Sequence, residues 1–194
     1  MLKLSPAKKE DAPALAWLIN LAGEGIPEYL WAGMIEGGER ALDIGARRAA
    51  REEGGFSYRN AVICSEDDAL AGMILAYRQA DPYVIKDIAE YPAVVRPLIE
   101  LESRAAGSWY INAIATYEAH RGKGVARLLM TDTEQKARSC GCSTLSLIVA
   151  SENDAAKRLY ESSGFTVKDV RPMILWPGCA HGGDWLLMCR DLLT

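Results

Sequence analysis

The 194-residue chain carries 22 Lys and Arg against 26 Asp and Glu, a formal net charge of −4, and 49% of its residues are hydrophobic. This length suits one domain with a sizeable core, and the composition is that of a folded protein rather than a disordered one. The acidic balance argues against nucleic-acid binding, because a nucleic-acid-binding protein usually carries an excess of basic residues.

The first residues lack an apolar signal segment, and no run of about 20 apolar residues follows, so we expect a cytoplasmic protein without a membrane partner. Five cysteines, an odd number, favour reduced thiols over a disulfide framework. Neither Cys140–Cys142 nor Cys179–His181 has the spacing of a common zinc site, so we expect no metal.

The first half of the chain predicts a strand, helices and a hairpin. Leu2–Leu4 begins a strand, and a helix with an inward apolar face follows between Asp11 and Gly23. A second helix is predicted over 39–51. The β-rich runs 58–64 and 69–78, separated by Ser-Glu-Asp-Asp, predict a β-hairpin.

Residues 81–107 are less regular, with three prolines and one short helix over 94–101. We interpret this segment as an insertion or lid. Regular elements then resume, with predicted strands at 109–116, 144–149, 165–170 and 185–190 and predicted helices from 125 and over 153–163. The order predicts one α/β domain over 1–194, with a mixed sheet flanked by helices.

The segment Arg121-Gly122-Lys123-Gly124-Val125-Ala126 opens the long helix. A helix start leaves backbone N–H groups unpaired and carries partial positive charge, so it can bind an anion such as phosphate. The dinucleotide fingerprint would need glycine at 127, where Arg127 stands, and a Walker A loop would need Ser or Thr after Lys123. On its own, the segment is equally consistent with a solvated basic turn.

Four pieces of sequence in order resemble the GCN5-related N-acetyltransferases: Ile114-Ala115-Thr116, Arg121 to Ala126, Asn153 to Tyr160, and Ser163-Gly164-Phe165. The resemblance is most specific from Trp109 to Phe165. It implies the fold of that family, a mostly antiparallel twisted sheet flanked by helices, and acetyl-CoA as cosubstrate.

The family's pyrophosphate loop, Gln/Arg-x-x-Gly-x-Gly/Ala, aligns with residues 119–124. Ala119 departs from its first position, which removes one polar side chain. By resemblance, the amides of Arg121, Gly122, Lys123, Gly124, Val125 and Ala126 receive the pyrophosphate. The strand edge at Ile114, Ala115 and Thr116 would pair with the pantetheine arm.

Asn153 and Tyr160 stand seven residues apart, so both project from one side of a helix. The resemblance implies that Asn153 contacts pantetheine and that Tyr160 is the general acid for the departing thiolate. A phenol is protonated at neutral pH and can donate that proton. The structural alternatives are an N-cap for Asn153 and a core aromatic for Tyr160.

The attacking amine must lose a proton, so a base or water chain is needed. The strand 109–116 contains no carboxylate, but Glu102 and Glu118 flank it. Either is a candidate base, and either can equally be a solvated surface charge.

The acceptor site should involve the segment after the first helix. Glu24, Tyr29 and Trp31 are candidate substrate contacts, because a carboxylate with aromatic rings suits an ammonium group; they can also be turn and core residues. The expected function is direct acetyl transfer to a primary amine of a small molecule or peptide. The alternative is a noncatalytic acyl-CoA-binding sensor, and a homodimer is compatible with either.

Overall fold

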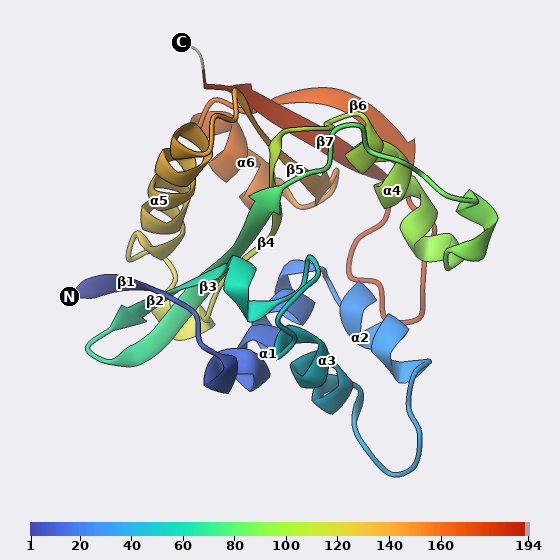
Figure 1. Cartoon of the computed structure of the whole chain (residues 1–194), viewed down its shortest axis with the longest axis horizontal. Helices are drawn as coiled ribbons and strands as arrows, with labels where there is room; N and C mark the ends of the chain where they lie inside the picture. The colour runs from blue at the N-terminus through green and yellow to red at the C-terminus, as the bar shows by residue number, and fades with distance from the viewer. Residues whose placement is uncertain (193–194) are drawn as a thin grey trace. The chain divides into compact units, whose positions relative to one another are not determined.

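The computed structural model describes residues 1–192 and contains one seven-stranded sheet. The strands follow the order β1-β2-β3-β4-β5-β7-β6 (Figure 1). Their bounds are β1 Leu2–Pro6, β2 Ala61–Glu66, β3 Ala69–Arg78, β4 Trp109–Thr116, β5 Thr144–Ala150, β6 Thr166–Pro172 and β7 Asp184–Asp191. β1 with β2, β2 with β3, β5 with β7, and β6 with β7 pair antiparallel, whereas β4 pairs in parallel with β5. The predicted mixed, mostly antiparallel sheet flanked by helices is confirmed.

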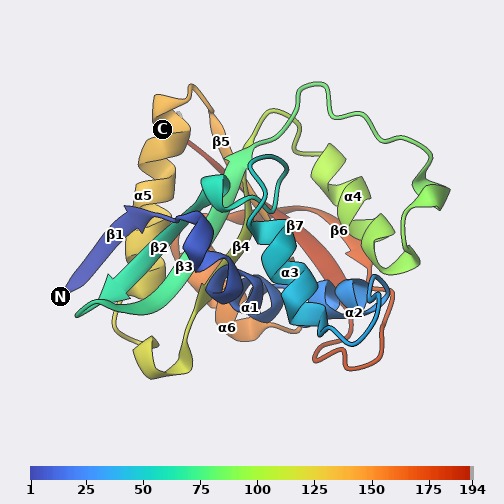
Figure 2. The ribbon, with the colours of Figure 1, turned by 60° about the horizontal axis from the view of Figure 1, so that its bottom comes forward.

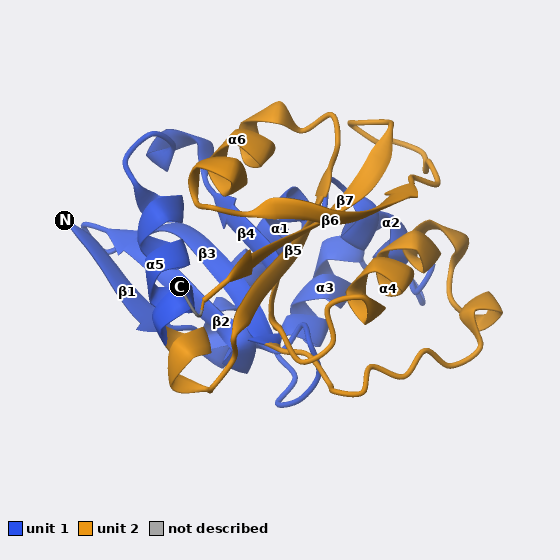
Figure 3. Cartoon of the chain, turned by 90° about the horizontal axis from the view of Figure 1, so that it is seen from above, with its two compact units in different colours: residues 1–77, 112–135 blue, residues 78–111, 136–194 orange. Residues whose placement is uncertain are grey.

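The helices are α1 Ala12–Ala22, α2 Ile26–Ala32, α3 Ala41–Ala49, α4 Arg96–Ser103, α5 Val125–Ser139 and α6 Asp154–Ser162. The chain divides into two compact units, which Figure 3 colours separately. Unit 1 contains residues 1–77 and 112–135, and unit 2 contains residues 78–111 and 136–194. Among the described residues, no helix combines the length and apolar character needed to cross a membrane.

In unit 1, α1 and α3 lie side by side (Figures 1 and 2). The predicted inward face of α1 is observed, since Leu15, Leu18 and Ile19 are buried. They share a core cluster with Met73 and Leu75 of β3. Burial of these apolar side chains is the main force holding the helices against the strands.

The helix α2 is absent from the elements predicted by sequence, because Gly25 and Pro27 read as helix breakers. In the structure Gly25 adopts φ 89° just before α2, and Pro27 occupies its first turn, where a proline lacks no needed donor. Asn20 of α1 completes the start, since its Oδ1 accepts from the Glu28 amide at 2.9 Å. The cap therefore comes from a preceding helix rather than from the residue next to α2.

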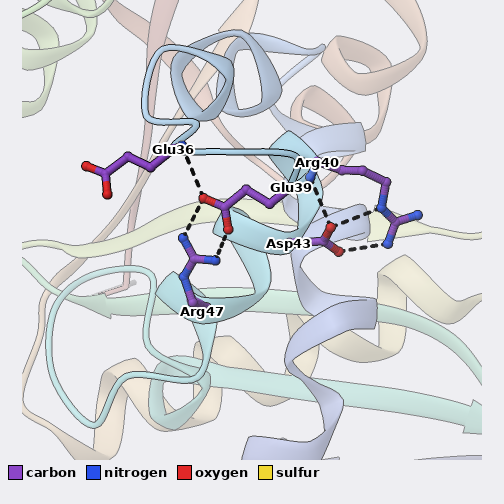
Figure 4. Close-up of polar contacts among 5 residues, drawn as sticks. All are labelled: Glu36, Glu39, Arg40, Asp43 and Arg47. Carbon is purple, nitrogen blue, oxygen red and sulfur yellow. Dashed lines mark hydrogen bonds and ion pairs between the residues drawn. The ribbon is translucent and has the colours of Figure 1, made fainter.

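The start of α3 carries two exposed ion pairs (Figure 4). Asp43 accepts from both the amide and the guanidinium of Arg40, and these hydrogen bonds lower the pKa of Asp43 to about 2. Glu39 pairs with Arg47 and accepts from the Glu36 amide. These contacts order the helix entry but, being exposed, contribute little stability.

In unit 2, α4 packs on the strands β5, β6 and β7. Arg171 of β6 reaches Glu100 of α4 at 2.8 Å and also pairs with Asp169 at 2.8 Å. The buried hydroxyls of Ser108 and Ser146 lie 2.6 Å apart, so a polar contact also joins β5 to the turn before β4. The segment 81–107 thus contains a packed helix.

Candidate functional site

The glycine segment forms a turn that leads directly into α5. Gly122 and Gly124 have φ of 75° and 87°, in the left-handed region that favours glycine. No atom lies within 4 Å of a Cβ built at either position, so the glycines are needed for backbone conformation rather than for space. A short 3-10 helix, Glu118–His120, precedes the turn.

The backbone amides of the turn divide into used and available groups. The Arg121 amide donates to the Glu118 carbonyl at 3.1 Å, so Arg121 can contribute to an anion site only through its side chain. Within residues 1–192, no backbone partner is recorded for the amides from Gly122 to Ala126. These N–H groups stand at the start of a 15-residue helix, a favourable position for an anion.

A carboxylate approaches the turn from the hairpin. One oxygen of Glu66, at the end of β2, accepts from Lys123 Nζ at 2.6 Å and lies 2.7 Å from His120 Nδ1. The hydrogen bonds from Lys123 and His120 lower the pKa of Glu66. Lys123 is therefore already paired.

The strand before the turn is closely packed against β3. A Cβ at Gly72 would lie 2.5 Å from the Ala115 carbonyl oxygen and 3.1 Å from the Thr116 Cα. The Tyr117 amide donates to the Ala71 carbonyl at 2.9 Å. Ala115 belongs to the core cluster, whereas Ile114 and Thr116 are half-buried.

Asn153 and Tyr160 take the positions on α6 that their spacing predicts. Asn153 is the N-cap, and its Oδ1 accepts from the Ala156 amide at 3.1 Å. Tyr160 is buried, with its ring centroid 6.0 Å from that of Phe165. The structural roles considered for both residues are thus observed, and they leave a ligand role open.

The two candidate bases differ in environment. Glu118 is exposed on the short 3-10 helix. Glu102 of α4 is half-buried, and its Oε2 accepts from the Tyr83 hydroxyl at 2.8 Å. Desolvation raises the pKa of Glu102, and hydrogen bonds from Tyr83 and Tyr110 partly offset that rise. Of the two candidates, Glu102 is thus the one whose pKa burial raises above its ordinary value.

The three acceptor candidates occupy different environments. Glu24 is half-buried, with a left-handed φ of 54° in the turn between α1 and α2. Tyr29 is 42% exposed on α2. Trp31 is a core residue, because its ring packs where a Cβ at Gly45 would lie 2.4 Å away.

Unit 2 contains a cavity of about 570 Å³ with lining residues of both charges, among them Arg78, Lys168 and Asp191. None of the predicted site residues lines it. Burial raises the pKa of its two thiols, to about 11 for Cys189, so both are poor nucleophiles.

Sequence patterns did not identify Glu66, Tyr83 or Tyr110. Glu66 lies 54 residues from His120, and Tyr83 lies 19 residues from Glu102. The only sequence signal was indirect: a carboxylate in a hairpin turn and tyrosines around an irregular segment.

Residues 28–165, well over half of the chain, match a family model described as "Acetyltransferase (GNAT) family". The chain is 43% identical over 61 residues to the uncharacterized N-acetyltransferase YycN of Bacillus subtilis, a match covering 31% of this chain and 39% of YycN. It is 35% identical over 63 residues to the L-methionine sulfoximine/L-methionine sulfone acetyltransferase of Salmonella typhimurium, covering 32% of this chain and 37% of that protein. The matched segments thus span under half the length of these curated relatives.

Solved structures share the fold at low sequence identity. A putative acetyltransferase, yncA from Salmonella typhimurium, solved with acetyl-CoA, aligns with a TM-score of 0.64 and 19% identity over 100% of this chain and 95% of that one. The crystal structure of a second acetyltransferase aligns with a TM-score of 0.65 and 20% identity over 98% of this chain and 99% of that one.

Proposed function

Because this chain belongs to the acetyltransferase (GNAT) family, we propose that it binds acetyl-CoA and transfers the acetyl group directly to a primary amine. The observation that carries the proposal is the turn before α5. Two of its glycines, Gly122 and Gly124, are left-handed, and the amides from Gly122 to Ala126 donate to no backbone carbonyl of the described chain. A pyrophosphate would accept hydrogen bonds from these amides and gain from the helix dipole. Arg121 would add its side-chain charge, and the strand edge at Ile114 to Thr116 would pair with the pantetheine arm.

The amine becomes reactive by losing a proton. We propose that Glu102 accepts this proton, directly or through one water. Its raised pKa supports this role, since a base works best when its pKa approaches the working pH. The free amine lone pair then attacks the thioester carbonyl to form a tetrahedral intermediate. The attack leaves the nitrogen positively charged, and it releases its second proton to solvent. Collapse of the intermediate then breaks the carbon–sulfur bond, and the coenzyme A thiolate leaves.

We assign the return of a proton to that thiolate to Tyr160, on the family resemblance and its place on α6, two turns after Asn153. Asn153 can contact the pantetheine arm through its side-chain N–H groups while its Oδ1 caps the helix. The raised pKa values of Cys142 and Cys189 support direct transfer, because a protonated thiol is a weak nucleophile.

For the acceptor we propose a small molecule or peptide whose ammonium group meets Glu24 and Tyr29. Trp31 is left out of this proposal because it packs in the core. Because the Salmonella relative is a methionine sulfoximine and methionine sulfone acetyltransferase, we add amino-acid derivatives to the acceptors worth testing.

The test is thiol release from acetyl-CoA with a panel of amino acids, polyamines and short peptides. We expect at least one amine to raise thiol release well above the amine-free rate. An acyl-CoA sensor would instead bind acetyl-CoA with no amine-dependent release, and that result would reject the enzyme proposal.

A further inference from the structure

The anion-binding turn has no packing of its own. A Cβ added at Gly122 or Gly124 would meet no atom within 4 Å, and residues 121–124 are all exposed. Its shape therefore depends on contacts at its ends and on side chains that reach it from other elements. The Tyr117 amide fixes one end to β3, and Val125, which is buried, begins the helix at the other.

Glu66 supplies a contact to the middle of the turn. A single oxygen, Oε2, lies 2.7 Å from His120 Nδ1 and accepts from Lys123 Nζ at 2.6 Å. The side chains of Glu66 and His120 are only 23% and 18% exposed, so this contact is better shielded than an ordinary surface pair. Through His120 and Lys123, which lie before and after Gly122, this contact connects the turn to the end of β2.

Because of this contact, the two cationic side chains of the turn, Arg121 and Lys123, differ in how much charge they can offer a ligand. Lys123 is held by Glu66, whereas the side chain of Arg121 has no recorded partner within residues 1–192. A lysine bound to a carboxylate presents less net charge to a phosphate than a free arginine does. Arg121 is thus the better placed of the two to meet a phosphate with its full charge.

We propose that Glu66 is a positioning residue for acetyl-CoA: through His120 and Lys123 it holds the turn so that the amides from Gly122 onward converge before a ligand arrives. This inference rests on the proposed acetyl-CoA site. Preorganised donors bind more tightly because their ordering cost is met on folding rather than on binding.

The test compares Glu66→Ala with Asp68→Asn, measuring acetyl-CoA affinity by calorimetry and steady-state kinetics. Asp68 lies in the same hairpin turn, is exposed and has no side-chain partner within residues 1–192. Its φ of 66° is one that asparagine also tolerates, so Asp68→Asn removes an equal charge and leaves the contact of Glu66 intact. We expect Glu66→Ala to weaken affinity about tenfold, as loss of a charge-assisted hydrogen bond can do, with kcat nearly unchanged. Asp68→Asn should stay near wild type, and Glu66→Gln, which keeps an acceptor oxygen, should recover part of the affinity.

A double-mutant cycle with Lys123→Met checks the route. If Lys123 acts through Glu66, the two losses will not add; additive losses would mean that Lys123 meets the phosphate itself and would overturn the proposal. Equal or tighter binding by Glu66→Ala would also overturn it, since that result makes Glu66 a repulsive neighbour of the pyrophosphate.

Hydrogen exchange in the ligand-free protein separates this inference from the proposed function. We expect faster exchange of the amides of His120, Arg121 and Leu128, which donate to backbone carbonyls around the turn, in Glu66→Ala but not in Asp68→Asn, whether or not acetyl-CoA binds. Unchanged exchange would refute the positioning role. Failure of the wild-type protein to bind acetyl-CoA would refute the proposed function instead.

Discussion

The carboxylate of Glu102 accepts hydrogen bonds from two tyrosine hydroxyls and is partly shielded from water. Tyr83 and Tyr110 stabilise its charged form by hydrogen bonding, but the loss of water has the larger effect and raises the pKa. A carboxylate with such a pKa holds a proton at a higher pH than an exposed one. Glu118 lies exposed, and this difference selects Glu102 as the proposed base.

Glu102 leads to a pH-dependent prediction. Because the protonated acid cannot accept the amine proton, kcat/KM should rise with pH through a pKa above about 4.3, the ordinary value for glutamic acid. Glu102→Gln should lower kcat about a hundredfold, a typical general-base contribution, and should remove this ascending limb. A pH–rate profile measures both effects.

Two further variants serve as controls for Glu102. Glu118→Gln should leave the profile unchanged, and a large loss there would transfer the role of base to Glu118. Tyr83→Phe removes a hydrogen bond that lowers the pKa of Glu102, so the ascending limb should move to higher pH. An ascending limb at an unchanged pH would mean that Tyr83 does not influence the pKa of the catalytic base.

Tyr160 combines a core ring with a proposed catalytic hydroxyl. Tyr160→Phe keeps the packing against Phe165, so thermal stability should change little while kcat falls about a hundredfold and acetyl-CoA affinity stays the same. Tyr58→Phe, at a half-buried ring on the 3-10 helix before β2, should leave kcat unchanged. Full activity of Tyr160→Phe in a turnover assay would remove Tyr160 as the acid.

At the level of elements, the proposed anion site depends on how β3, the part of β4 from residue 112 onward and the start of α5 pack within unit 1. Gly72 of β3 lies where a side chain would meet the Ala115 carbonyl and the Val125 side chain. Its neighbour Ala71 accepts from the Tyr117 amide just before the 3-10 helix. Gly72, 50 positions before Gly122, therefore determines how closely β3 can approach the end of β4 and the start of α5.

Gly72→Ala should disturb this packing. The new methyl would lie 2.5 Å from a backbone oxygen that cannot turn away, and such overpacking costs roughly 1–3 kcal/mol of unfolding free energy. Denaturant melts measure the loss. Gly38→Ala is the matched control, since no atom lies within 4 Å of its added Cβ, and equal stability of the two variants would contradict this account.

Helix and strand positions were largely predictable from the sequence. The predicted strand at 109–116 matches β4, and the predicted helix from 125 matches α5, because apolar periodicity and glycine stops are local signals. The helix α2 was missed because its N-terminal cap comes from Asn20, eight residues before Glu28 and on another helix. Local rules do not include such a partner.

For the whole molecule, mass action gives a test of the proposed acetyl-CoA site that requires no acceptor amine. A ligand that binds only the native chain at 100 times its Kd adds about 2.7 kcal/mol to the unfolding free energy. For a chain of 194 residues this should raise Tm by roughly 5–10 °C.

The matched control is Gly124→Glu. Its φ of 87° suits glycine, and a carboxylate at the start of α5 would repel the pyrophosphate, so acetyl-CoA should give this variant no increase in Tm. A normal increase, measured by thermal denaturation, would contradict the assignment of the glycine turn. An equal increase with ATP would favour a general nucleotide site instead.

The sequence by itself determined the element order apart from α2, the mixed sheet, the glycine turn before α5 and the resemblance to the family, because these features follow from local patterns in the chain. Only the tertiary structure decided that Trp31 packs in the core, that Lys123 is paired with Glu66, and that Glu102 rather than Glu118 is desolvated. Burial, ion pairing and pKa depend on which distant segments the fold brings together. A residue's type and its neighbours in sequence do not contain that information.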